Sequence, residues 1–305
     1  MTRFPRPVLP LLALALMAGC ATPEVSGARI ISEGFCMPSA ETVGAALGEP
    51  VPAPLPGFSA RAQRMAVLIG IAPQLSGLIV GDGPPLQRLR MRQMVVERIV
   101  AASLDVQEAM ALLDCEDERG DQLRSLLEAR ESRASRRLTI ASIGIGAFTA
   151  VATGGLSLAA APTAASAVGI AGGLGEASSG VAQLLGESRG RLMTSRNILR
   201  EIRERPEQST MLPAVVWRYL LRHDTEGASV LDQVVEQWRG AGLLGEGGFE
   251  NPDRRTALLV GEGGVYSTAD LNARGAMLDG LEAAIGRMSR SLRLLLAEMQ
   301  TVLPP

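Results

Sequence analysis

The chain has 305 residues, a net charge of −2, and a composition in which 47% of the residues are hydrophobic but only 3% are aromatic. So small a net charge provides no long-range field for nucleic acid. All 30 basic residues are arginine, which excludes a P-loop lysine, a Schiff-base lysine and a Ser-x-x-Lys nucleophile. Because the apolar residues are mainly Leu, Val, Ile, Met and Ala, the composition favours an all-α fold.

The first 20 residues have the pattern of an export signal. Arg3 and Arg6 precede an apolar run over residues 8–16, which is shorter than the roughly 20 residues of a membrane-spanning helix. Small residues and a cysteine follow, in the order Met17-Ala18-Gly19-Cys20. With these residues the N-terminus resembles a bacterial lipoprotein precursor. The alternative is an ordinary secretory signal in which the cysteine is incidental.

The resemblance implies that residues 1–19 are a signal peptide and that Cys20 carries the lipid (a palmitate-type acyl modification) as the first residue of the mature chain. In that class, a residue other than Asp after the cysteine implies transport to the outer membrane, and Ala21 stands there. The expected localisation is therefore the outer membrane, with a lipid anchor and a periplasmic body.

The cysteine count agrees with that compartment. If Cys20 is lipidated, Cys36 and Cys115 remain as a pair. An oxidising periplasm favours a disulfide between them, and the alternative is two buried thiols.

Residues 20–58 are rich in proline, which alternates with other residues in the stretch 50–56. This pattern favours extended polyproline II structure and forbids a helix. We expect a lipidated stalk over residues 20–58, followed by a helical domain over residues 59–305. If Cys36 is bridged, the alternative is a segment pinned to the surface of that domain.

Helical patterns begin with a short helix over residues 59–71. A strong helix follows from Pro84-Pro85, with one apolar stripe of Met91, Val95, Ile99, Ala102, Val106, Ala109 and Leu113. The acidic stretch 114–121 is expected to break or turn this helix. Further helices are predicted over residues 121–137 and 177–204.

The C-terminal part predicts two shorter helices, over residues 212–222 and 226–239. Residues 256–260 and 265–267 are expected to pair as a hairpin across a Gly-rich turn. A last helix begins with a capping-box spacing at Ser267 and Asp270. Its apolar residues recur three and four positions apart over 278–302, which predicts a coiled-coil seam that packs within the chain or against a second chain, either a copy of itself or another envelope protein.

Residues 138–175 contain no charged residue. Thr153-Gly154-Gly155 and Ala161-Pro162 are natural turn sites, so the segment is predicted to form two apolar helical legs of about 18 residues each, long enough for a bilayer core. Small residues would let the legs pack closely. The candidates are Gly144, Gly146, Ala150, Gly154, Gly169 and Gly173.

This layout resembles the helical pore-forming toxins, in which an apolar hairpin interrupts long charged helices. The resemblance implies a hairpin that inserts into a membrane. The alternative is a tight hairpin inside a soluble bundle, because no Trp or Tyr lies near either end and Ala and Gly are weakly hydrophobic.

The sequence contains few residues in patterns typical of a catalytic or metal-binding site. His223 is the single histidine and is expected to end a helix rather than to bind zinc or activate a serine. The acidic stretch 114–121 lacks the order of a calcium loop. We therefore predict no metal, no cofactor and no enzymatic activity, although a carboxylate-only hydrolase of cell-wall sugar polymers stays open.

The expected fold is an elongated all-α bundle of long amphipathic helices with a central Ala/Gly-rich hairpin. The expected function is that of a lipid-anchored cell-envelope protein with a structural or interaction role, within an outer-membrane assembly. The alternative is a membrane-inserting or pore-forming component that acts through residues 138–175.

Overall fold

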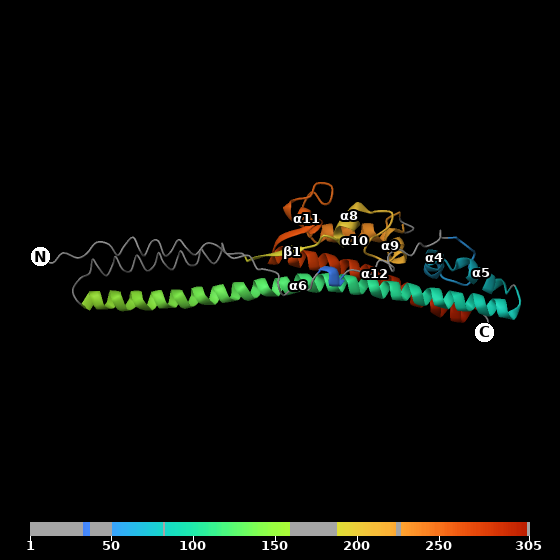
Figure 1. The fold of residues 1–305 in the computed structure, drawn as a ribbon, viewed down its shortest axis with the longest axis horizontal. Coiled ribbons are helices and arrows are strands. Elements are labelled where there is room, and N and C mark those ends of the chain that lie inside the picture. The colour runs from blue at the N-terminus through green and yellow to red at the C-terminus, as the bar shows by residue number, and fades with distance from the viewer. Residues whose placement is uncertain (1–32, 37–50, 82, 159–187, 224–226, 304–305) are drawn as a thin grey trace. The chain divides into compact units, whose positions relative to one another are not determined.

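The chain is mostly helical in the computed structural model, which describes residues 33–36, 51–81, 83–158, 188–223 and 227–303, with the backbone alone described within 137–158 (Figure 1). Two long helices, α6 (Pro85–Leu158) and α12 (Thr268–Val302), pack together. A two-stranded sheet joins β1 (Arg189–Met193) to β2 (Gly263–Ser267). The helical fold class that the composition predicts is confirmed at this level.

The chain divides into two compact units. The first contains the described residues of 123–191 together with 265–268. The second contains residues 29–122, 192–264 and 269–305 where they are described. The second unit holds most of the buried side chains.

The apolar stripe of α6 lies in the core of the second unit. Six of the seven residues predicted for it are buried, and Met91 is half-buried. Pro84 precedes the helix and accepts backbone hydrogen bonds from Gln87 and Arg88, in the position where a missing amide donor costs nothing. The stripe thus packs the first half of α6 against the rest of the unit.

The predicted break at the acidic stretch 114–121 is wrong, because α6 runs through it without interruption. No proline lies in this stretch, and its charges are accommodated on the helix. Glu116 pairs with Arg119 one turn later, and Glu118 accepts a hydrogen bond from Gln122. The separate helix predicted over residues 121–137 is therefore part of α6.

The Thr153-Gly154-Gly155 site is also not a turn. The backbone of α6 stays helical through it and ends at Leu158. Glycine is tolerated inside a helix at a cost of roughly 1 kcal/mol relative to alanine, so a glycine pair is a weak stop signal on its own. The second predicted turn site, Ala161-Pro162, lies outside the described residues.

The seam of α12 closes inside the chain. Leu278, Leu281, Ile285, Met288, Leu292, Leu295 and Met299 are buried, and Val302 is half-buried. These side chains are covered by the chain itself, without a second chain. Figure 1 shows α12 lying along the first half of α6.

The helix predicted over residues 177–204 is wrong in its described part. Residues 189–193 form β1, in which Gly190 and Leu192 are buried and their neighbours are exposed. This alternation has the period of two of a half-buried strand. Asn197 then caps the short helix α8 (Ile198–Glu204), because its side chain accepts a hydrogen bond from the Leu199 amide.

The predicted hairpin of residues 256–260 with 265–267 is also wrong. Arg254–Leu259 is the helix α11, which Asp253 caps by accepting a hydrogen bond from the Thr256 amide. A short apolar run is compatible with either a strand or a helical turn. Here the N-terminal cap from Asp253 favours the helix. Strand β2 pairs instead with β1, which is distant in the sequence.

The remaining helices are short. They are α2 (Glu33–Cys36), α4 (Ala60–Leu68), α5 (Ala72–Val80), α9 (Ala214–Leu221) and α10 (Val230–Gly240). Ser59 caps α4 and Ser229 caps α10, the latter in a full capping box with Asp232. The three helices α4, α9 and α10 correspond to helices that the sequence predicts at these places.

Candidate interaction surface

The candidate lipidation site, Cys20, lies outside the described residues. Among the helices whose residues are described, none combines the length and the apolar character needed to cross a bilayer. This finding does not extend to residues 137–187, whose side chains are not described.

The candidate residues of the apolar hairpin fall into two groups. Four of them lie on the helical backbone of α6, and two lie outside the described residues. The first group is Gly144, Gly146, Ala150 and Gly154, and the second is Gly169 and Gly173.

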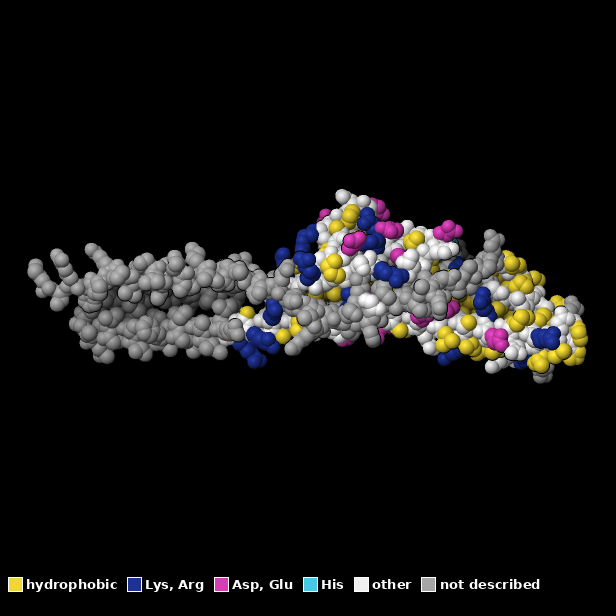
Figure 2. Space-filling view, viewed as in Figure 1, with side chains coloured by type: hydrophobic (Ala, Val, Ile, Leu, Met, Phe, Trp, Pro, Cys, Tyr) yellow, Lys and Arg dark blue, Asp and Glu magenta, His cyan; other side chains and the backbone are white. Residues whose placement is uncertain are grey.

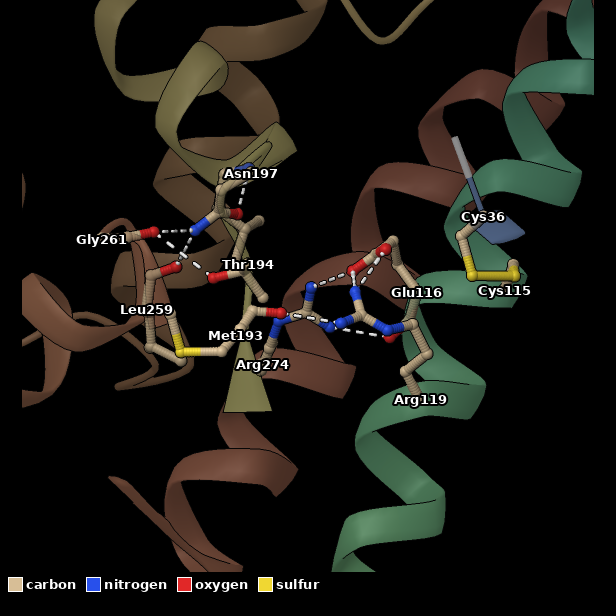
Figure 3. A network of polar contacts seen from close by, with 11 residues as sticks. Cys36, Cys115, Glu116, Arg119, Met193, Thr194, Asn197, Leu259, Gly261 and Arg274 are labelled. Carbon is tan, nitrogen blue, oxygen red and sulfur yellow. Dashed lines mark hydrogen bonds and ion pairs between the residues drawn. A yellow bond between two sulfur atoms is a disulfide. The ribbon is translucent and has the colours of Figure 1, made fainter. Parts of the chain in front are cut away.

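The structure contains a disulfide between Cys36 and Cys115, the pair that the cysteine count favours. Cys36 ends α2, and Cys115 lies in the middle of α6 (Figure 3). Leu55 and Phe58 are also buried. The segment 20–58 is therefore attached to the second unit at its bridged cysteine and again near its C-terminal end.

A buried ion network lies beside this disulfide (Figure 3). Both oxygens of the Glu116 carboxylate accept hydrogen bonds from Arg119, and one of them also accepts from Arg274 of α12, at 2.7–2.9 Å. Arg274 donates as well to the Glu116 backbone carbonyl, and Arg119 to the carbonyl of Met193 in β1. Each of the three charged side chains is nearly inaccessible to solvent.

This network joins α6 and α12 to the end of β1. The Glu116 carboxylate, which accepts three side-chain hydrogen bonds and is shielded from solvent, thus connects three elements of the fold. The acidic stretch 114–121 was expected to break or turn the helix, and its sequence did not predict a buried ion network. The i, i+3 spacing of Glu116 and Arg119 was the available signal, but their burial depends on Arg274, which is 158 residues away.

A second polar cluster fixes the region between β1 and α11. The side-chain amide of Asn197 donates to the carbonyls of Leu259 and Gly261, at 2.7 and 2.8 Å. The Thr194 hydroxyl donates to the Gly261 carbonyl, and the Thr194 amide donates to Glu262. These buried donors satisfy the carbonyls at the end of α11 and hold the Gly-rich connection to β2 (Figure 3).

His223 does not end a helix, in contrast to the expectation. Helix α9 ends at Leu221, and the extended backbone of Arg222 leads the chain away from the helix axis. The His223 side chain is exposed, with Nδ1 3.0 Å from the Gly227 carbonyl. Among the described residues, no group of three or more His, Cys, Asp and Glu side chains is arranged to hold a metal ion.

The first half of α6 carries a second apolar stripe, on the side opposite to the core. Leu86, Leu89, Val96, Val100 and Leu104 have relative exposures between 38% and 62%. At about 100° per residue, these five positions share one side of the helix. We call them the exposed apolar face.

Hydrophobic side chains gather over the end of the second unit where α4, α5 and the start of α6 lie (Figure 2). The five side chains of the exposed apolar face present on the order of 500 Å² of surface, the size of patch that on monomeric proteins is often functional. Sequence reasoning missed this face because it followed the stronger buried stripe of the same helix. The signal was a second set of large apolar residues in steps of three, four and seven.

Polar groups lie within and beside this face. Gln93 lies between Leu89 and Val96, and its amide donates to the Glu97 carboxylate at 2.8 Å. Arg90 and Glu97 are exposed along one edge of the face, seven residues apart. The face is therefore apolar along its centre, with one amide inside it and two opposite charges at its margin.

A comparison of the chain with protein-family models, curated proteins and solved structures finds no match.

Proposed function

We propose that this protein is a lipid-anchored component of the cell envelope with a structural or interaction role and no enzymatic one. Its finer architecture is an elongated helical bundle with an apolar hairpin over residues 138–175. The observation that carries the interaction role is the exposed apolar face of α6. Large aliphatic side chains in a row, on a helix whose other side is already buried, favour contact with another macromolecule.

The anchoring part of the proposal is supported by the N-terminal residues up to Cys20 and by the disulfide. A bridge between Cys36 and Cys115 suits an oxidising compartment outside the cytoplasm. The outer membrane and a periplasmic body are the location that follows from Ala21 in the resembled class of precursors.

Metabolic labelling with palmitate, followed by cell fractionation, tests the anchor. The wild-type chain should incorporate the label and sediment with outer membranes, and Cys20→Ser should do neither. A labelled Cys20→Ser chain, or an unlabelled wild-type chain free in the periplasm, would overturn the lipid anchor.

The interaction role is tested by adding a charge to the exposed apolar face. Leu89→Glu should leave thermal unfolding unchanged, because Leu89 lies away from the core, but should abolish assembly into larger envelope complexes on native gels. Ala283→Glu, at an exposed position of α12, is the matched control and should assemble normally. Equal assembly of both variants would refute a role for this face.

The second candidate function is membrane insertion through residues 138–175. The observation that favours it is the backbone of α6, which continues as one helix from the charged body into the uncharged segment as far as Leu158. A continuous helix of this kind satisfies its own backbone hydrogen bonds, as a segment that enters a bilayer must.

An arginine within the apolar segment tests this alternative. If the segment enters lipid, Gly146→Arg and Val168→Arg should each abolish salt-resistant co-sedimentation of the unlipidated chain with liposomes, because a cation in the bilayer core costs several kcal/mol. Ala283→Arg is the control and should bind as the wild type does. Liposome binding by all of these chains, or by none, would argue against insertion.

A further inference from the structure

We infer that the exposed apolar face of α6 binds the same face of a second copy of this chain, with the two helices antiparallel. The spacing of the residues on this face supports a helix–helix contact. Leu86, Leu89, Gln93, Val96 and Val100 follow one another in steps of three and four residues, which is the heptad spacing of a helix–helix seam. The face is exposed along its length in the described structure.

The charges at the margin of the face favour the antiparallel arrangement. In an antiparallel pair, Leu89 faces Val100 of the second copy, and Gln93 faces Val96. That register places Arg90 beside Glu97 of the second copy, and by symmetry Glu97 beside Arg90. In a parallel pair, Arg90 and Glu97 of the two copies would lie on opposite sides of the seam, so contacts between Arg90 and Glu97 are specific to the antiparallel pair.

Gln93 and Glu97 also argue against lipid as the occupant. A lipid surface would bring the Gln93 amide from the middle of this face, and the Glu97 carboxylate from its margin, to the boundary of the acyl chains, where polar groups lose their hydration. At a helix–helix seam, a single polar residue among apolar ones is common and fixes the register. The polar residues of this face thus fit a protein partner better than a membrane.

The small area of the exposed apolar face predicts a weak dimer. Each copy offers on the order of 500 Å², compared with about 800 Å² for each partner in a stable complex. If the chain is anchored in one membrane as proposed above, tethering raises the effective concentration and strengthens the contact. The contact itself does not require the anchor, so the two proposals fail separately.

Sedimentation equilibrium of the full chain in density-matched detergent, over a range of protein concentrations, tests the dimer. The wild type should show a reversible monomer–dimer equilibrium. Arg90→Glu and Glu97→Arg should each weaken it by about tenfold, since two attractive contacts become repulsive. The double variant, Arg90→Glu with Glu97→Arg, should restore most of the affinity.

Circular dichroism melts of the same variants should be unchanged, because both side chains are exposed. Charge reversals that weaken the dimer without rescue in the double variant would overturn the antiparallel register. A chain that is monomeric at all concentrations would overturn the dimer. If a monomer made without its lipid, starting at Ala21, floats with phosphatidylglycerol vesicles and its Leu89→Glu variant does not, the face belongs to lipid.

Discussion

At the residue scale, Glu116 is a buried carboxylate held between two buried arginines. Glu116→Ala would leave Arg119 and Arg274 without their shared counter-ion in a site that excludes water. We expect a loss of about 3–5 kcal/mol in the free energy of unfolding. Glu118→Ala, on the exposed side of the same turn, should change it by less than about 0.5 kcal/mol. Urea denaturation measures both, and equal losses would show that the network contributes nothing particular.

Asp232 shows how a helix cap makes stability depend on pH. Hydrogen bonds from the Ser229 hydroxyl and amide, followed by the nearby Arg205, lower the pKa of this carboxyl from 3.8 to about 2. Because the pKa is lower in the folded state, the ionised carboxylate stabilises the fold above about pH 4, and this contribution is lost as the pH falls toward 2.

Removing the Ser229 hydroxyl should weaken this dependence. Ser229→Ala removes the hydroxyl but keeps the amide hydrogen bond and Arg205, so it should raise the pKa of Asp232 part of the way toward 3.8 and cost about 1 kcal/mol of stability at neutral pH. The stability difference between variant and wild type should shrink as the pH falls toward 2. NMR titration of the Asp232 carboxyl carbon gives the pKa, and a value still near 2 in the variant would assign the shift to another cause.

At the element scale, two glycines of α12 have opposite surroundings. A Cβ at Gly280 would lie 2.9 Å from Nε1 of the buried Trp238, whereas a Cβ at Gly286 would meet nothing within 4 Å. Gly286→Ala should therefore stabilise the protein by roughly 0.5–1 kcal/mol through helix propensity. Gly280→Ala should destabilise it by about 1–3 kcal/mol, because Trp238 must move. Thermal unfolding of the two variants checks the contrast, and a shift of the same sign in both would contradict it.

Sequence patterns predict helices best where one period extends over several turns. The buried stripe from Val95 to Leu113 and the seam over residues 278–302 are of this kind, and both lie where the pattern places them. Strand β1 was predicted as helix because its neighbours Leu199 and Ile202 extend a helical pattern. Its pairing with β2 depends on a contact between distant segments, which local spacing does not encode.

The exposed apolar face of α6 was missed for a related reason. One helix with two apolar sides has a weak overall amphipathic pattern, so its second side is visible only after the first is known to be buried. The ion network was missed because Arg274 reaches Glu116 from a helix far along the chain. The disulfide pair, in contrast, follows from counting three cysteines and assigning one to the lipid.

At the scale of the whole molecule, the disulfide closes a loop between residues 79 positions apart. Chain entropy predicts that such a bridge stabilises the fold by up to about 4–5 kcal/mol. Cys36→Ser with Cys115→Ser should therefore unfold at clearly lower urea concentration than the wild type. Addition of dithiothreitol should lower the midpoint of the wild type and leave that of the variant unchanged. If the wild type and the variant had the same urea midpoint, with and without dithiothreitol, the bridge would be dispensable for stability.

The same bridge also determines how mechanical force would travel through the chain. Tension applied to the polypeptide before Cys36 passes through the sulfur–sulfur bond to Cys115 and enters α6 at its middle. The covalent path through the bridge therefore bypasses residues 37–114, which include the exposed apolar face. A pull on the N-terminus would thus reach the middle of α6 without loading the backbone of the exposed apolar face in series.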